Sequence, residues 1–446
     1  MVKNADTQTC YVNVQEIRDQ GLCVGCGTCF TICPTNAITI CRNRKGFYVP
    51  VVNNEVCNKC RLCIKVCPGH VVDFNLMNKN VFDKLPEDDL LGSYLNCYMG
   101  YAADTRVRWA GQSGGLVTAL LVFALEEGII DGAVVTRMSR SDPLSPEVLV
   151  AESKKEILSA SKSKYCSVPL NVVVKEVLKK DGKYAIVGVP CQIHGLRKLE
   201  MIKTELKKKI VLHLGLFCSH MLSFLAIDFL LHKASIRKND LIKFEYKSKA
   251  LRGWPGDVLF TLSNGAEKFL SREHRTLIVP FFTPWRCKMC YDQVNEFADI
   301  SFGDAWLPEV MHCKEGTSVL ISRTETGERL LQRASNEGEI KLQEISRSKI
   351  VQSQRGPLFS KKSLLGARVV ISKLLGENVP EYNVKLLKPR KVKRLSAVFD
   401  YINTRIPYNS TTNLLLKHTP LSLLSLYESS ILSALTTTRG ENAILA

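Results

Sequence analysis

The stretch that decides the fold is CVGCGTCFTICP, Cys23–Pro34, because its pattern returns as CNKCRLCIKVCP, Cys57–Pro68. Each run has the spacing C-x2-C-x2-C-x3-C-P, which is typical of iron-sulfur proteins that hold two clusters. In such proteins three cysteines of one run bind one cluster, and the fourth cysteine, followed by proline, reaches the other cluster. The repeat therefore predicts a ferredoxin-like α+β domain with two 4Fe-4S clusters.

The crossed pattern assigns eight ligands to the two clusters. The first cluster takes Cys23, Cys26, Cys29 and Cys67, and the second takes Cys57, Cys60, Cys63 and Cys33. Zinc is the alternative, but structural zinc usually takes two Cys pairs a dozen or more residues apart. Each fourth cysteine is followed by a β-prone segment, Ala37–Ile40 or His70–Phe74, with a glycine turn in Asn43–Val52 between them. We expect a domain with pseudo-twofold symmetry over residues 1–76.

Composition indicates a protein with at least one large core. The chain has 446 residues, of which 45% are hydrophobic, and this length predicts two or three units. Seventeen cysteines favour metal or redox chemistry over disulfides in a reducing compartment. The first ten residues lack a secretory pattern, and the longest apolar run, Leu116–Leu125, is about half a membrane span. We expect a soluble cytoplasmic protein.

The charge is strongly basic and unevenly distributed. The net charge is +18, and residues 351–446 contribute fourteen Lys and Arg against five Asp and Glu, a net +9. Five of these cations lie in KPRKVKR, Lys388–Arg394. Such a field favours an anionic partner, for example an acidic protein, the cytoplasmic face of a membrane or a polyanionic cofactor, although a solvated charged face is the alternative. No nucleic-acid-binding motif accompanies the charge, so we expect no nucleic acid partner.

Residues 90–345 show strands and helices in alternation. We expect a buried helix over Ser113–Gly128, with Ser113 as a candidate cap, and a strand at Ile129–Thr136. A strand, a turn and a helix follow in Lys183–Leu199, and another buried strand in Lys209–Cys218. This order predicts an α/β core with parallel strands, in which ligands lie at the carboxyl ends of the strands.

Two further regions complete the chain. Leu241–Ser322 reads as a second β-rich part with glycine turns. Residues 346–446 form a basic, helical C-terminal extension that serves docking or packing. One helical stripe in this extension consists of Leu424, Tyr427, Ile431 and Leu435.

Four more cysteines lie where the α/β core would bring them together. Cys191 and Cys218 follow predicted buried strands, and WRCKMC contains the pair Cys287 and Cys290. The spacing leaves two alternatives open, a third cluster or buried inert thiols. The other cysteines have no partner at ligand spacing and are read as ordinary thiols: Cys10, Cys41, Cys97, Cys166 and Cys313.

Five successive motifs carry a resemblance to a known family. They are AGQSGGLVTALLVFALEEGIIDGAVV (Ala110–Val135), SKSKYC (Ser161–Cys166), VGVPCQIHGLRKL (Val187–Leu199), LGLFCSH (Leu214–His220) and WRCKMCYDQVNEFADISFGDAW (Trp285–Trp306). With the two-cluster domain, they resemble the coenzyme F-420 hydrogenase/dehydrogenase beta-subunit family over most of Cys23–Arg323.

The resemblance implies a flavoprotein that exchanges hydride between the deazaflavin coenzyme F-420 and FAD and passes electrons through iron-sulfur clusters. In that family Cys191, Cys218, Cys287 and Cys290 correspond to the ligands of a cluster beside the flavin. FAD would be needed because a deazaflavin exchanges an electron pair, a cluster accepts single electrons, and a flavin does both. The implied order of groups is F-420, FAD, the third cluster, and then the two N-terminal clusters.

The resemblance also suggests where FAD binds. Glycines at a helix start let backbone N–H groups approach a pyrophosphate, and the lysines of SKSKY suit a phosphate or carboxylate. A glycine turn and solvated lysines are the alternatives. The candidate contacts are Gln112, Ser113, Gly114, Gly115, Thr118, Lys162, Lys164 and Gln192. No catalytic base is assigned, because hydride transfer needs none. His194 and His220 are read as structural, and Asp299 and Asp304 as residues that hold a turn.

The function that follows is that of an electron-input subunit in a reduced F-420 dehydrogenase. Its partner would be a ferredoxin, a disulfide reductase or a membrane complex, with the basic tail available for docking at a membrane surface. One alternative is a ferredoxin-dependent FAD reductase of a pigment or other organic substrate, and another is a flavin-free iron-sulfur relay. A sulfite reductase of this superfamily would need a siroheme domain with its own cysteine motif, but only Cys313 follows Cys290. The oligomeric state stays open.

Overall fold

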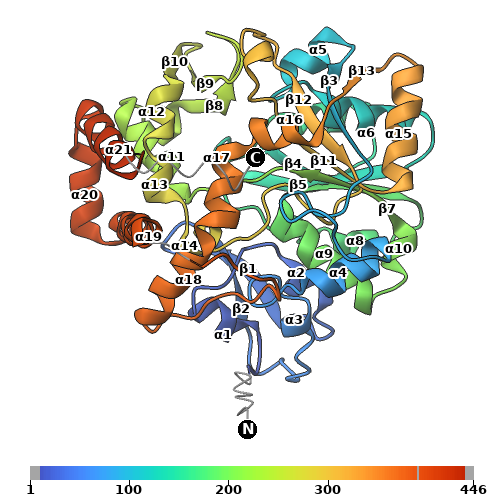
Figure 1. The fold of residues 1–446 in the computed structure, drawn as a ribbon, viewed down its shortest axis with the longest axis horizontal. Coiled ribbons are helices and arrows are strands. Elements are labelled where there is room, and N and C mark those ends of the chain that lie inside the picture. The colour runs from blue at the N-terminus through green and yellow to red at the C-terminus, as the bar shows by residue number, and fades with distance from the viewer. Residues whose placement is uncertain (1–10, 389–390, 437–446) are drawn as a thin grey trace.

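The computed structural model describes residues 11–388 and 391–436 (Figure 1). The N-terminal cysteine-rich domain lies at one end of the molecule, below a large mixed sheet. A smaller sheet and the C-terminal helices lie to one side of the large sheet, on the left in this view (Figure 1). No helix within the described ranges is long and apolar enough to cross a membrane.

The N-terminal domain combines a hairpin with short helices. Its elements are α1 (Val14–Asp19), α2 (Thr28–Ile32), β1 (Ile38–Arg42), β2 (Tyr48–Val52), α3 (Leu62–Lys65) and α4 (Phe74–Phe82). Strands β1 and β2 pair antiparallel, and the turn between them is closed by a hydrogen bond from the Gly46 N–H to the Asn43 carbonyl at 3.0 Å. The strand expected at Ala37–Ile40 is therefore confirmed.

The pseudo-twofold symmetry expected of this domain is wrong at its second β-prone segment, His70–Phe74, which does not form a strand to match β1. Instead of forming a matching strand, Val71 makes a single parallel bridge to Glu381, and α4 begins at Phe74. The Val72 N–H donates to the Glu381 carbonyl at 2.8 Å, and the Glu381 N–H donates to the His70 carbonyl at 2.9 Å. The C-terminal extension thus supplies the backbone partner of this segment.

The large sheet has eight strands and a parallel centre. In spatial order they are β13 (Ile340–Glu344), β3 (Asn96–Ala102), β12 (Ser318–Ser322), β11 (Ile300–Asp304), β7 (Ile210–Leu216), β6 (Tyr184–Gly188), β4 (Gly132–Met138) and β5 (Pro146–Ala151). Strands β11, β7, β6 and β4 are parallel, whereas the outer strands pair antiparallel. The expected parallel core is confirmed within a mixed sheet.

Helices cover both faces of this sheet. On one face, side chains such as Val135 pack against α6 (Leu116–Glu126) and α15 (Glu325–Asn336). On the other face, Val134 packs with α9 (Pro190–Ile202) and the N-terminal domain, because successive strand residues point to opposite faces. The smaller helices around the sheet are α5 (Thr105–Ala110), α7 (Lys154–Ser159), η1 (Leu170–Val172), α8 (Val174–Val177) and α10 (Leu206–Lys209).

The start of the buried helix differs from the expectation. Helix α6 begins at Leu116, and its N-cap is Gly115, whose φ of 78° is in the left-handed region that glycine adopts at little cost. The Ser113 hydroxyl does not cap the helix. It donates instead to the Thr317 carbonyl at 2.5 Å, which ties the loop before α6 to the residue before β12.

The expected second β-rich part divides between two sheets. Strands β8 (Leu241–Ser248), β9 (Asp257–Leu262) and β10 (Glu267–Leu270) form a separate antiparallel sheet, but β11 and β12 join the large one. Strand β11 does so because it pairs in parallel with β7. The small sheet packs with α11 (Phe224–Lys233), α12 (Arg272–Thr276) and α13 (Val279–Phe282), and η2 (Lys238–Asp240) precedes β8.

The C-terminal extension packs along the core. Its elements are α16 (Arg347–Ser353), α17 (Arg355–Leu358), η4 (Phe359–Ser363), α18 (Leu365–Leu374), α19 (Lys391–Asn403), η5 (Ile406–Tyr408), α20 (Ser410–His418) and α21 (Leu421–Thr436). Within the expected stripe of α21, Leu424 is buried and Tyr427 is 38% exposed. The side chains of Ile431 and Leu435 lie outside the described part, as do Pro389 and Arg390 of the basic stretch.

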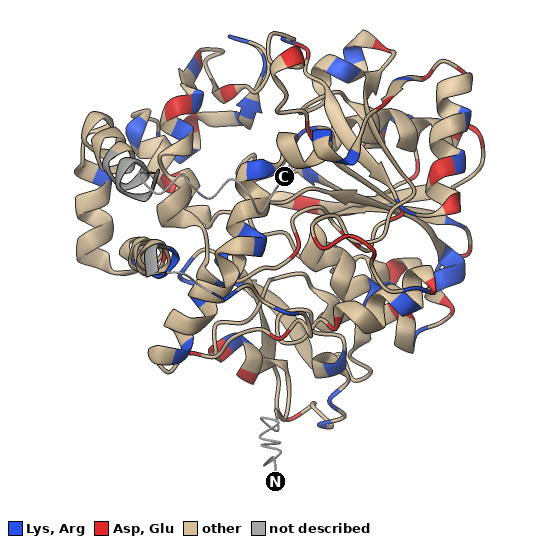
Figure 2. Cartoon of the chain, viewed as in Figure 1, with Lys and Arg blue, Asp and Glu red and all other residues tan. Residues whose placement is uncertain are grey.

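Part of the basic excess of this extension points inward. The Lys361 ammonium donates to the Asp292 carbonyl at 3.0 Å, Lys362 pairs with Glu296 at 2.6 Å, and Arg368 pairs with Asp400. All three cations are buried. Helices α20 and α21, by contrast, carry few charged side chains (Figure 2). Several of the tail's cations therefore hold it on the core rather than presenting charge to a partner.

A buried ionic network joins two strands of the large sheet to α9. The His213 ring contacts the Asp299 carboxylate at 3.0 Å through Nδ1 and the Glu200 carboxylate at 2.7 Å through Nε2. Asp299 also accepts the His213 backbone N–H at 2.7 Å, so it holds this junction, as expected of a structural aspartate. Burial and Arg197 oppose protonation of His213, but the two carboxylates outweigh them, and the net pKa of His213 is raised.

We expect Asp299→Asn to lower the free energy of unfolding by about 3–5 kcal/mol, because it leaves the charge of His213 partly unpaired in a buried site. A histidine whose pKa is raised on folding contributes stability that is complete below its unfolded pKa of about 6.5 and is lost as pH rises through the folded value. The variant should therefore show a weaker fall of stability above pH 6.5 in denaturant titrations. An unchanged pH profile would contradict the assignment.

Candidate functional site

The first set of cysteines surrounds one pocket of the N-terminal domain. Cys23, Cys26, Cys29 and Cys67 line it, together with Ile40 and Pro50 of the hairpin. Burial raises the pKa of Cys23 to about 12 and that of Cys26 to about 11, and in each case the neighbouring Cys67 adds to the rise. Four such thiols cannot all ionise unless a cation compensates them, and bound iron supplies that compensation.

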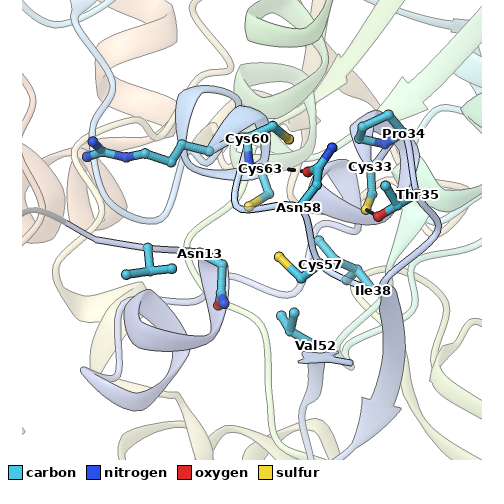
Figure 3. Close-up of a pocket in the computed structure, with 12 residues that line it drawn as sticks. Asn13, Cys33, Pro34, Thr35, Ile38, Val52, Cys57, Asn58, Cys60 and Cys63 are labelled. Atoms are coloured by element: carbon cyan, nitrogen blue, oxygen red, sulfur yellow. Dashed lines mark hydrogen bonds between the residues drawn. The ribbon is translucent and has the colours of Figure 1, made fainter. Parts of the chain in front are cut away.

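The second set surrounds a neighbouring pocket (Figure 3). Cys33 comes from the end of α2. Cys57 and Cys60 come from the loop that leads into α3, and Cys63 lies within that helix. The Ala37 N–H donates to the Cys33 sulfur at 3.3 Å, a contact that suits a thiolate. Cys33 of the first run thus lies with the second run, and Cys67 lies with the first, as the crossed pattern predicts.

Each of these two pockets has four cysteines in its lining. Within residues 11–388 and 391–436, no three His, Cys, Asp or Glu side chains come close enough to hold one metal ion. The first two cysteine sets instead border pockets, whose other walls are mostly apolar. A four-iron cluster binds each cysteine at a separate corner, so its ligands surround a wider space than the four ligands of a zinc ion.

The third set lies at the end of the parallel strands. Cys191 is at the start of α9 and Cys218 follows β7, while Cys287 lies in α14 (Trp285–Lys288) and Cys290 just after it. Because β6 and β7 are adjacent, their following residues are brought together. Burial raises the pKa of Cys218 to about 12, and although Lys361 opposes this, Cys287 and Cys290 add to it. The structure therefore brings these four cysteines together.

The glycine loop expected to contact FAD is tightly packed against the sheet. The Gly114 N–H donates to the Ser318 hydroxyl at 3.0 Å, and a Cβ on Gly114 would lie 2.6 Å from the Gly100 carbonyl oxygen. This close approach accounts for the glycine without a ligand. Gln112 donates to the Pro255 carbonyl at 3.4 Å, but its side-chain oxygen is buried and has no partner. Among the side-chain atoms of this loop, the Gln112 oxygen is therefore available to a ligand.

The other expected FAD contacts are engaged within the protein. The Lys164 ammonium donates to three carbonyls at the end of α7, and burial lowers its pKa to about 7. Lys162 pairs with Glu245 of β8. Gln192 accepts the Val189 N–H and donates to the Val168 carbonyl, both at 2.9 Å, and Thr118 is buried in α6. Their contacts with FAD remain a prediction.

A group of aromatic and basic side chains that the sequence did not indicate lies near the third set. The rings of Tyr165 and Tyr246 stack at 4.5 Å, and the Lys247 ammonium lies 4.9 Å from the Tyr165 ring centre. The guanidinium of Arg275 lies 5.4 Å from the Tyr246 ring. His220, two residues after Cys218, is 6.0 Å from Tyr165. Of this group, Tyr165 and His220 lie within the quoted motifs, but no motif includes Tyr246, Lys247 or Arg275.

Two polar atoms of this group have no partner in the protein. The Tyr246 hydroxyl and the Arg275 Nε are buried and unpaired, as is the indole N–H of Trp254. Buried polar groups are almost always hydrogen-bonded, so such atoms mark a place for a bound group. His194, in contrast, is buried against Asp292 at 2.8 Å, in agreement with a structural role.

Comparison with known proteins places the chain in a family. Residues 97–175 and 181–348 match the models of the coenzyme F-420 hydrogenase/dehydrogenase beta subunit, N-terminal part and C terminus respectively. Residues 22–71 match a 4Fe-4S dicluster domain. The chain belongs to the coenzyme F-420 hydrogenase/dehydrogenase beta-subunit family.

Its similar proteins include oxidoreductases and their subunits. A subunit of the F(420)H(2) dehydrogenase of Methanosarcina mazei is 26% identical over 73% of this chain and 86% of its own length. The beta subunit of the coenzyme F-420 hydrogenase of Methanothermobacter thermautotrophicus is 29% identical over 56% and 84%. The coenzyme F-420-dependent sulfite reductase of Methanocaldococcus jannaschii is 29% identical over 77% of this chain, which spans only 50% of that reductase.

A solved structure supports the fold. A chain of the F-420-reducing [NiFe] hydrogenase complex from Methanosarcina barkeri superposes with a TM-score of 0.52 at 24% identity, covering 67% of this chain and 98% of that one. The beta-subunit core and the N-terminal iron-sulfur domain expected from the sequence are therefore supported by the family models, and this structure supports the fold.

We expect Cys33→Ala to remove the second cluster and leave the first, whereas Cys67→Ala should do the opposite. In each variant iron content should fall by up to about four atoms per chain. Electron paramagnetic resonance of the reduced protein distinguishes the two clusters. Cys41→Ala is the matched control, since Cys41 is exposed and lines neither pocket. Loss of only the first cluster in Cys33→Ala would overturn the crossed assignment.

Proposed function

We propose that this family member moves hydride between coenzyme F-420 and FAD and then passes single electrons through three 4Fe-4S clusters to a partner protein. The observation that carries the proposal is the order of the cysteine sets. Asn171 joins the third set to the first, since its backbone N–H donates to the Cys26 carbonyl and its side chain donates to the carbonyl of Gln192, next to Cys191, both at 2.9 Å. Helix α2 joins the first set to the second, because it contains Cys29 and ends before Cys33. The sets therefore follow one another in space as third, first and second.

We place FAD at the inner end of this series, beside the third set. The residues that would hold it are those with unpaired buried polar atoms, Gln112, Tyr246, Trp254 and Arg275, together with the charged Lys247. A flavin dinucleotide offers both donors and acceptors to such atoms and anionic phosphates to the cations. When bound, FAD supplies the conversion between an electron pair and single electrons. The stacked pair Tyr165 and Tyr246 adds an aromatic wall.

The outer end of the series reaches the molecular surface. Cys60 is exposed, and the neighbouring Lys59, Arg61 and Lys65 are exposed as well. Val56, 46% exposed, adds an apolar contact to this rim. A basic rim with an apolar residue beside a redox centre suits an acidic redox protein, because complementary charge accelerates encounter. We therefore place the docking site of the electron-transfer partner at this rim.

The cofactor content tests the proposal directly. The protein purified without oxygen should carry one FAD and about twelve irons per chain, and reduced F-420 should bleach the bound flavin. Cys191→Ala should keep about eight irons, since only the third set is broken. Clusters without flavin would indicate an iron-sulfur relay, and FAD that does not respond to F-420 would indicate another organic substrate. Either outcome would overturn the proposal.

The docking site is tested by reversing its charge. The double variant Lys59→Glu, Arg61→Glu should slow electron transfer to an acidic ferredoxin at least about tenfold at low salt, because steering is lost, and the difference should shrink as salt is raised. Reduction of a small neutral dye should be unaffected. Lys341→Glu, on the far edge of the large sheet, is the matched control (Figure 1). Equal rates for both variants would contradict this location.

A further inference from the structure

One buried arginine joins the third cysteine set to the first. Arg286 lies in α14 and is only 6% exposed. Its Nε donates to the carbonyls of Leu22 at 3.2 Å and Gly69 at 3.1 Å, and its Nη2 donates to the carbonyl of Pro68 at 3.2 Å. A single guanidinium of the core thus binds three carbonyls of the N-terminal domain.

These carbonyls belong to residues beside the cysteines. Leu22 directly precedes Cys23, and Pro68 directly follows Cys67. Arg286 itself directly precedes Cys287. The guanidinium therefore contacts the backbone beside two ligands of the first set, and the residue that carries it is adjacent in sequence to one ligand of the third set.

The C-terminal extension completes this bridge. The hydroxyl of Tyr382 accepts a hydrogen bond from Arg286 Nη1 at 2.9 Å and donates to the Met289 carbonyl at 2.7 Å, and Met289 directly precedes Cys290. Tyr382 is 6% exposed and follows Glu381, whose backbone pairs with the segment after Cys67. Arg286 and Tyr382 together connect both loops of the first set with the C-x2-C pair of the third.

Arginine suits this position in two ways. Its planar fork carries five N–H donors in fixed directions, so it can bind several carbonyls at once, and lysine cannot reproduce that arrangement. Its permanent charge in a buried site also favours an added electron on a nearby cluster, because net charge and hydrogen bonding set cluster potentials.

We propose that Arg286 is a positioning residue that fixes the third cluster against the first and, through its buried charge, raises the reduction potentials of both, with Tyr382 holding the guanidinium in place. The inference rests on the proposed function, since both cysteine sets must hold clusters. It explains why the C-terminal extension reaches the N-terminal domain: the extension completes the contact between the two redox sites.

A second cation allows the effects on the two clusters to be separated. The Lys198 ammonium of α9 donates to the carbonyls of Cys67 at 3.0 Å and Val71 at 2.7 Å. Lys198 therefore contacts the first set, and both carbonyls that accept its hydrogen bonds belong to the N-terminal domain. Lys198→Met should lower the potential of the first cluster while leaving that of the third.

The experiment is a redox titration of the anaerobically loaded full chain, followed by electron paramagnetic resonance. Arg286→Met should shift the potentials of the first and third clusters to more negative values and slow electron transfer between them at least about tenfold, as loss of a supporting shell often does. Arg286→Lys should largely keep the potentials but still slow transfer, because the fork is lost. Tyr382→Phe should slow transfer by a smaller factor.

Arg323→Met is the matched control for Arg286→Met, because it removes a buried guanidinium elsewhere. The buried guanidinium of Arg323 also donates to three loop carbonyls, those of Leu91 and Ser93 at 2.7 Å and Val294 at 3.0 Å, but none of them is adjacent to a cysteine of the three sets. This variant should leave all cluster potentials unchanged. Hydrogen exchange on the loaded chain adds a second readout, in which Arg286→Met should speed exchange of the amides from Gly69 to Val72 and Arg323→Met should not.

The outcomes separate this inference from the proposed function. If the wild-type chain loads no clusters, the proposed function fails and the inference fails with it. If the wild type loads about twelve irons but the potentials of both clusters ignore Arg286→Met, the inference alone is overturned. A potential shift equal in Arg286→Met and Arg323→Met would show a general loss of packing and would also overturn it.

Discussion

Mutual repulsion among buried thiolates is the constraint on which the rest of this structure depends. Each of the two N-terminal sets gathers four cysteines in a largely apolar setting, where charge is costly unless it is compensated. Iron provides most of that compensation, and the protein adds N–H donors such as that of Gly25, which points at the Cys23 sulfur at 3.3 Å. Cations beside the first and third sets come from three separate elements: Arg286 of α14, Lys198 of α9 and Lys361 of η4.

This distribution of cations explains the architecture beyond the N-terminal domain. A small two-cluster domain has a limited core of its own, and here it shares one apolar cluster with α9 and the C-terminal extension. Phe74 lies between His194 of α9 and Tyr382 of the extension, with ring centres 5.6 and 6.0 Å away. The redox centres are therefore held by contacts between segments distant in sequence, and their relative positions follow from packing.

Local sequence patterns predicted much of the fold and of the metal site. The spacing of the two runs predicted that Cys33 lies with the second set and Cys67 with the first. Three closely spaced cysteines of a run bind one cluster, and the fourth cysteine points to the other cluster. Apolar periodicity located α6, α9 and the parallel strands to within a few residues. The prediction of a strand at His70–Phe74 was wrong. A strand needs a pairing partner, and this segment makes only a single bridge, from Val71 to Glu381 of the C-terminal extension. The prediction of a cap at Ser113 was also wrong, because its hydroxyl donates to the Thr317 carbonyl instead.

The sequence by itself determined the two N-terminal cysteine sets, the alternation of the core and the family, because these depend on spacing and on local periodicity, whereas spacing left the third set open. Only the tertiary structure decided which polar groups are free for a ligand. Lys164 and Gln192 matched the expected motif but are bound to nearby carbonyls, whereas Tyr246 and Arg275 lay in unremarkable segments and keep unpaired buried atoms. A hydrogen bond between segments has no spacing signal, and for the same reason the bridge from Arg286 to Tyr382 became visible only once the chain was folded.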